Sequence, residues 1–90
     1  MTTTTNLRTR ALAFRMSELS QMRTWSEEDA SERRRIVSRE VKALEALPAD
    51  VDDAIVRHTL EVISRQESEA FQARELARAE ALSAWYAAGR

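Results

Sequence analysis

The chain has 90 residues and a net charge of −1, and it contains one glycine, one proline and no cysteine. This length allows a single domain with a small core. The shortage of turn residues argues against β-sheet folds, and the lack of cysteine excludes disulfides and thiol chemistry. No apolar run approaches the roughly 20 residues that span a bilayer. We therefore expect an all-α, soluble, cytoplasmic protein with no membrane association.

Three helices are expected along the chain. Residues 1–5 are predicted to be a disordered tail, and residues 6–90 a single α-helical domain. Thr5 or Asn6 can cap a first helix over 6–23, and a second helix is predicted over 26–47. Pro48 then disfavours helical angles at the preceding residue, and Asp50 is the expected cap of a third helix over 50–88.

The third predicted helix is unusually long. Residues 51–88 contain neither glycine nor proline, and a continuous helix of that length would measure about 57 Å. The polar run 64–69 is either a hinge or the solvated middle of one helix, and we favour continuity because it holds no strong helix breaker. We expect a hairpin of the second helix with the front of the third, and a first helix covering one side. The rest of the third helix would project, or pair with a second copy in an oligomeric, coiled-coil-like bundle.

The third helix has two apolar sides, and two short helices cannot easily cover both. One side carries Val51, Ile55, His58, Val62, Ala73 and Leu76; the other carries Val56, Leu60, Phe71, Leu82 and Trp85. Leaving large apolar side chains in water forgoes about 1.5–3 kcal/mol each. The predicted partner or oligomer interface is therefore Val56, Leu60, Phe71, Leu82, Trp85 and Tyr86. The alternative is that the first helix folds over the second side.

Charge is unevenly distributed. Residues 1–44 carry nine basic and six acidic side chains, whereas residues 45–90 carry five and nine. This asymmetry either arises by chance or indicates packing between the two halves, within a chain or between chains. The one basic cluster could contact phosphates, or it could form a solvated face paired to the acidic residues just before it. It consists of Arg33, Arg34, Arg35, Arg39 and Lys42.

No motif predicts catalysis, a cofactor, a metal site or a small-molecule substrate. His58 is the only histidine, so a histidine metal cluster cannot form. We therefore expect a non-enzymatic protein-interaction module that forms a homodimer and acts as an adaptor or inhibitor. Phage and mobile-element proteins that block a host component are often of this kind. The alternatives are a small dimeric DNA-binding regulator that uses Arg33 to Lys42, and a structural assembly subunit.

Overall fold

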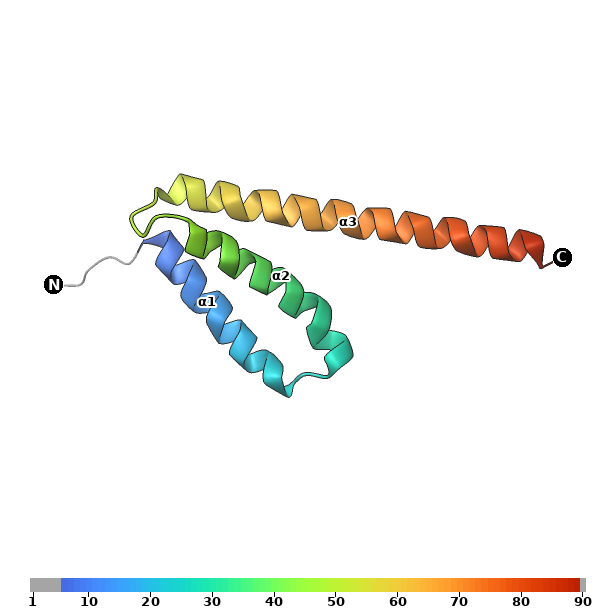
Figure 1. Ribbon diagram of the computed structural model, residues 1–90, viewed down its shortest axis with the longest axis horizontal. Helices are drawn as coiled ribbons and strands as arrows, with labels where there is room; N and C mark the ends of the chain where they lie inside the picture. The colour runs from blue at the N-terminus through green and yellow to red at the C-terminus, as the bar shows by residue number, and fades with distance from the viewer. Residues whose placement is uncertain (1–5, 90) are drawn as a thin grey trace.

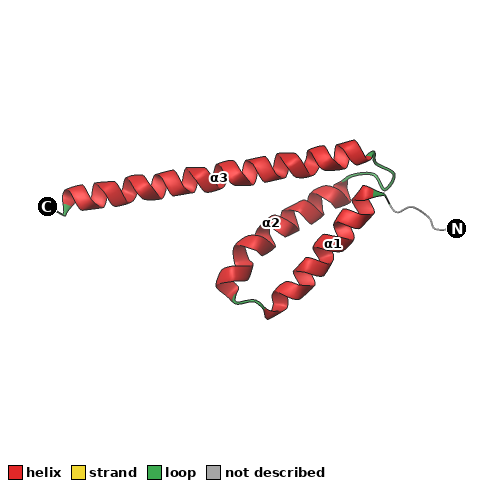
Figure 2. Ribbon diagram, turned by 180° about the vertical axis from the view of Figure 1, so that it is seen from behind, coloured by secondary structure: helices red, strands yellow, loops and turns green. Residues whose placement is uncertain are grey.

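The computed structural model describes residues 6–89, which form three α-helices with no strand (Figures 1 and 2). Helix α1 spans Leu7–Gln21, α2 spans Glu27–Ala46 and α3 spans Asp53–Ala88, with a short 3-10 turn, η1, at Met22–Thr24. The predicted all-α, three-helix class is confirmed. The predicted tail at 1–5 lies outside the described residues.

Local capping explains where α1 begins and ends. Its N-cap is Asn6, whose side-chain oxygen accepts a hydrogen bond from the Thr9 N–H at 3.0 Å. This satisfies one of the amide donors that a helix N-terminus leaves free. The same side chain donates to the Ala49 carbonyl at 2.5 Å, which ties the start of α1 to the connection between α2 and α3. At its other end, α1 tightens into η1 and buries Met22.

The third helix begins three residues later than the sequence indicated. Asp52, rather than Asp50, is its N-cap, and its carboxylate accepts from the Ala54 N–H at 2.9 Å. The Val51 N–H donates to the Pro48 carbonyl at 3.1 Å and closes a turn after the proline. Because this turn uses the residues around Asp50, the chain reaches helical geometry only after Asp52.

The core lies inside the α1–α2 hairpin and extends to the front of α3. One buried cluster lies mainly between α1 and α2, and the second joins α1, α2 and the front of α3. Leu12 of α1 packs against both clusters, so the core is continuous. The clusters consist of Met22, Ala30, Val37 and Val41, and of Ala11, Leu44 and Val56.

Helix α3 is continuous through the polar run 64–69, as predicted, and it extends far beyond the core (Figure 1). Its 36 residues correspond to about 54 Å. The molecule measures 73 × 30 × 17 Å and has a radius of gyration of 18.3 Å. A compact chain of this length would have a radius of gyration of about 12 Å. The far part of α3 therefore projects away from the α1–α2 hairpin, as one of the two expected arrangements requires.

Candidate protein-binding surface

The contacts of α3 with the hairpin end in a group of ion pairs. The last buried apolar side chain on α3 is Ile63. One turn later, the Glu67 carboxylate binds Arg35 at 2.6 Å and Arg39 at 2.8 Å, both from α2. A final link joins Arg74 to Glu32 at 3.2 Å. These pairs attach the middle of α3 to the part of α2 between Glu32 and Arg39.

The ion pairs at this junction stabilise the ionised forms of Glu67 and Arg35. The Glu67 side chain is only 10% exposed, and hydrogen bonds from Arg35 and then Arg39 lower its pKa to about 2. The pKa of Arg35 is raised by its hydrogen bonds to Glu67 and Glu32. The polar run 64–69 is therefore neither a hinge nor simply solvated, because one of its members anchors α3 to α2.

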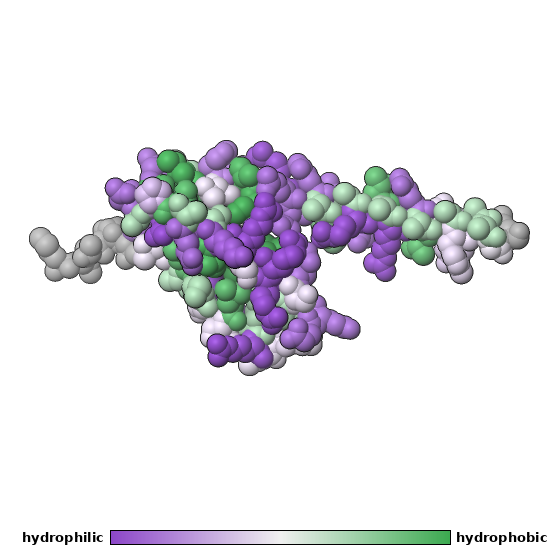
Figure 3. Space-filling model, in the orientation of Figure 1, coloured by the Kyte–Doolittle hydropathy of each residue, from purple (hydrophilic) through white to green (hydrophobic). Residues whose placement is uncertain are grey.

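Beyond Arg74, every described residue of α3 is exposed. We call residues 75–89 the overhang. It carries large apolar side chains in water: Trp85 is 66% exposed, Tyr86 65% and Leu82 49%. Figure 3 shows hydrophobic surface along this projecting arm and hydrophilic surface where α2 meets α3. The overhang therefore presents an apolar surface that the hairpin does not cover.

The overhang carries a pair of aromatic rings in contact and an open hollow. The rings of Trp85 and Tyr86 meet edge to face, with centroids 5.0 Å apart and planes inclined by 75°. An open hollow beside them is lined by Arg78, Ala81, Leu82 and Trp85. Aromatic side chains next to a small-residue floor are typical of anchor points in protein interfaces.

The predicted interface residues separate into two groups. Phe71, Leu82, Trp85 and Tyr86 are exposed. Val56, in contrast, is fully buried against Ala11 and Leu44, and Leu60 packs on the same cluster. Placing Val56 and Leu60 on a partner surface was therefore wrong.

The reason is that the helical wheel showed two apolar sides but not which one the hairpin would cover. The side carrying Val56 and Leu60 faces the core, and the opposite side at Ile55 is 50% exposed. The alternative in which α1 covers the second side holds at the front of α3, where Ala11 packs against Val56, and fails along the overhang, where all described residues are exposed.

Most of the basic cluster is paired with carboxylates. Arg33 binds Glu18 of α1 through two hydrogen bonds, at 2.7 and 3.2 Å, and these lower the pKa of Glu18. Arg35 and Arg39 share Glu67. Arg34 lies 3.7 Å from Glu27, and Lys42 is exposed.

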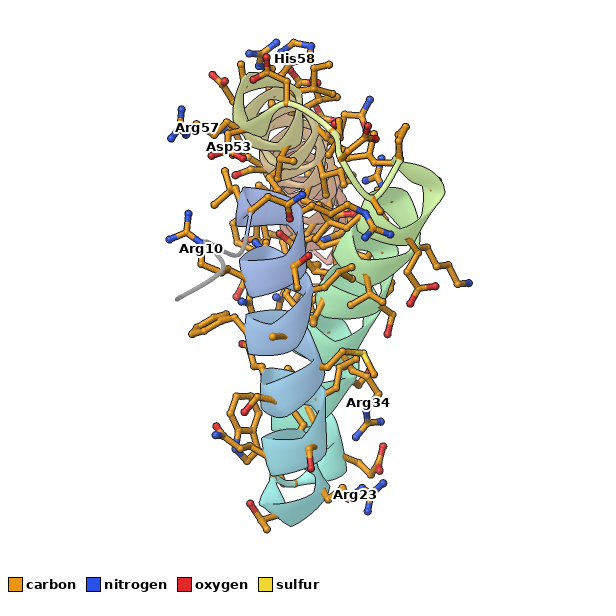
Figure 4. The ribbon with its side chains drawn as sticks, turned by 90° about the vertical axis from the view of Figure 1, so that its left-hand side faces the viewer. Arg10, Arg23, Arg34, Asp53, Arg57 and His58 are labelled. Carbon is orange, nitrogen blue, oxygen red and sulfur yellow. The ribbon has the colours of Figure 1, made fainter. Side chains whose placement is uncertain are left out.

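Arginines inside and outside the basic cluster lie on different sides of the molecule. Figure 4 shows Arg10 and Arg57 pointing outward on one side of the molecule, and Arg23 and Arg34 on the other. The pairs to Glu67 agree with the second of the two readings of the charge asymmetry, in which the basic half packs against the acidic half within the chain. Three members of the arginine cluster, Arg33, Arg35 and Arg39, thus link neighbouring helices through carboxylates.

Sequence reasoning missed Glu67 as a structural residue. The signal was present, because Glu67 lies four residues after Ile63 and so continues the face of α3 that packs on α2. A carboxylate at that position, opposite an arginine-rich stretch of α2, indicates an ion pair between the helices.

The described residues contain neither a membrane-spanning helix nor a cluster of metal ligands. Within residues 6–89, no helix has both the length and the apolar character needed to cross a bilayer. Across the same residues, no three histidine, cysteine, aspartate or glutamate side chains gather closely enough to hold a metal ion. His58 is exposed and points to solvent (Figure 4).

No protein-family model, curated protein or solved structure matches this chain.

Proposed function

We propose that this chain is a helical protein-interaction module whose contact surface is the overhang of α3. The observation that carries the proposal is the exposure of Leu82, Trp85 and Tyr86 on a helix that has left its own core. Burying each such side chain on a partner would contribute about 1.5–3 kcal/mol. The α1–α2 hairpin then acts as the base that holds this helix in place.

Helix physics supports this division of roles. Isolated helices shorter than about 12–15 residues are marginal in water, so the overhang depends on continuity with the front of α3 or on a partner. The ion pairs at Glu67 and Arg74 hold the helix up to the point where it leaves α2. A partner helix or groove would complete the packing that the hairpin does not provide.

In biological terms, the module would act as an adaptor or inhibitor by occupying a surface of another protein, and a homodimer is the simplest working form. A structural assembly subunit is the alternative, and it predicts a mass well above that of a dimer. The DNA-binding alternative receives no support, because Arg33, Arg35 and Arg39 are engaged by carboxylates of the same chain.

The test is site-specific photo-crosslinking in the cells that produce the chain. A photoreactive amino acid replaces Leu82, and a matched control replaces Ile55, because the two are 49% and 50% exposed. We expect protein adducts at position 82 and few or none at position 55. Equal labelling at both positions, or none at position 82, would contradict the proposal.

A further inference from the structure

A second heptad pattern runs along α3, beside the stripe that packs on α2. Phe71, Glu75, Arg78, Leu82 and Trp85 recur at alternating steps of four and three residues. Residues at these steps lie on one face of a helix and form the seam of a coiled coil. The seam extends to small residues at its two ends, Ser64, Ser68 and Gly89.

This seam is complementary to itself when reversed. In an antiparallel pair centred between Leu76 and Ala77, Phe71 lies opposite Leu82 and Glu75 lies opposite Arg78. Glu75 and Arg78 are the only charged residues of the seam, and they have opposite signs. A twofold axis makes each pairing occur twice, as an interface between identical subunits requires.

We propose that the occupant of this face is a second copy of the chain, with the two α3 helices antiparallel and Glu75 paired with the partner subunit's Arg78. This inference rests on the proposed function and specifies its partner. A parallel pair is disfavoured, because it would set Glu75 beside the partner subunit's Glu75 and Arg78 beside the partner subunit's Arg78.

The hollow on the overhang fits this arrangement. Its lining residues, Arg78, Ala81, Leu82 and Trp85, stand at positions i, i+3, i+4 and i+7. Four residues at this spacing form the hole that receives a side chain in coiled-coil packing. In the antiparallel pair, the partner subunit's Phe71 falls at the centre of this hole, between Ala81 and Leu82. Phe71 is 56% exposed in the single chain, so it is available to insert.

The length of α3 also fits the antiparallel pair. The pairing overlaps residues 64–89 of both chains, which corresponds to roughly 37 Å of helix. Trp85 lies opposite the partner subunit's Ser68, whose small side chain leaves room for the indole. Each α3 ends at Ala88, close to the level at which the other chain's Glu67 attaches to α2. The two hairpins therefore lie at opposite ends of the paired helices.

The two pairs of Glu75 with the partner subunit's Arg78 fix the register of the dimer, but they also lower its affinity. A polar pair inside a seam loses solvation, but it also penalises other registers. We therefore expect a dimer weaker than a fully apolar coiled coil of equal length, with a single register.

Charge exchange tests the register by sedimentation velocity on the purified full chain. Glu75→Arg leaves four cations at the centre of the dimer and Arg78→Glu leaves four anions, so each should raise the dissociation constant at least about tenfold. The double variant Glu75→Arg with Arg78→Glu should restore the dimer. An equimolar mixture of the two single variants should form a heterodimer. Single variants that dimerise as well as the unmodified chain would overturn the pairing.

Disulfide trapping provides an independent readout, because the chain has no cysteine. A variant with Phe71→Cys and Leu82→Cys should oxidise to a covalent dimer. Leu82→Cys alone should not, since its two copies would lie about 16 Å apart along the axis, beyond the reach of a disulfide. A covalent dimer from Leu82→Cys alone would show a parallel pair and overturn the proposal.

The failures of the two proposals are distinguishable. A chain that stays monomeric from micromolar to millimolar concentration would overturn the dimer. If Leu82 still gives photo-adducts with a different protein, the interaction module stands and its partner is not a second copy. If Leu82 gives no adducts at all, both proposals fall.

Discussion

The Glu67 carboxylate lies 2.6 Å from the guanidinium of Arg35, at the point where the apolar packing between α2 and α3 ends. This pair lies near the end of the contact between α3 and the α1–α2 hairpin, and the overhang begins two helical turns later. The ion pairs of Glu67 and Arg74 with α2 therefore mark the end of the part of α3 that stabilises the fold, and the part beyond them is left for a partner.

Acid should weaken this junction. The pKa of Glu67 is about 2 in the folded chain, below its ordinary value of 4.5, because Arg35 and Arg39 hydrogen-bond its charged form. A lowered pKa contributes stability above 4.5 and loses it as the pH falls toward 2. Chemical unfolding of the unmodified chain and of Glu67→Gln should show a difference in unfolding free energy that narrows across this window. A difference that does not change with pH would contradict the role of the charge.

Truncation of Leu44 should destabilise the fold strongly. Its side chain is fully buried between α1 and α3, so Leu44→Ala should lower the unfolding free energy by about 2–5 kcal/mol. Leu76→Ala is the matched control, because Leu76 is 62% exposed and lies outside the proposed seam, and it should cost less than about 0.5 kcal/mol. Denaturant titration measures both changes. Similar losses for the two variants would place the core elsewhere.

The N-cap of α3 can be tested with a pair of aspartates. Asp52→Ala removes the acceptor of the Ala54 N–H and should cost about 1 kcal/mol. Asp50→Ala should change the unfolding free energy by less than about 0.5 kcal/mol, because Asp50 does not cap the helix. Thermal or denaturant unfolding separates the two. A larger loss at Asp50 would support a helix that begins where the sequence first indicated.

Removal of the overhang should leave the base folded. All the buried side chains of α3 lie at or before Ile63, so a chain ending at Arg74 should unfold cooperatively with a midpoint near that of the full monomer. Circular dichroism should show the loss of the helix over 75–88 only. A chain ending at Leu60 is the contrasting control, because it lacks Ile63 and Glu67, and it should lose cooperative unfolding.

The helical class, the breaks before residue 26 and at Pro48, and the continuity of α3 could all be predicted from the sequence, because they follow from local backbone preferences. A stretch of sequence that lacks glycine and proline can continue as one helix, whereas the proline after Leu47 ends a helix. The sequence left open whether the aromatic end of α3 is exposed or covered by the first helix, and the fold leaves it exposed.

Which side of α3 packs into the core depends on the arrangement of the three helices. Val56 and Ile55 are neighbours with similar hydrophobicity, yet Val56 is buried and Ile55 is half exposed. Burial energy is not directional, so a wheel with two apolar sides cannot choose between them. The choice depends on how the turn after Pro48 orients α3 against the hairpin, and on Arg35 and Arg39 reaching Glu67 across the space between helices.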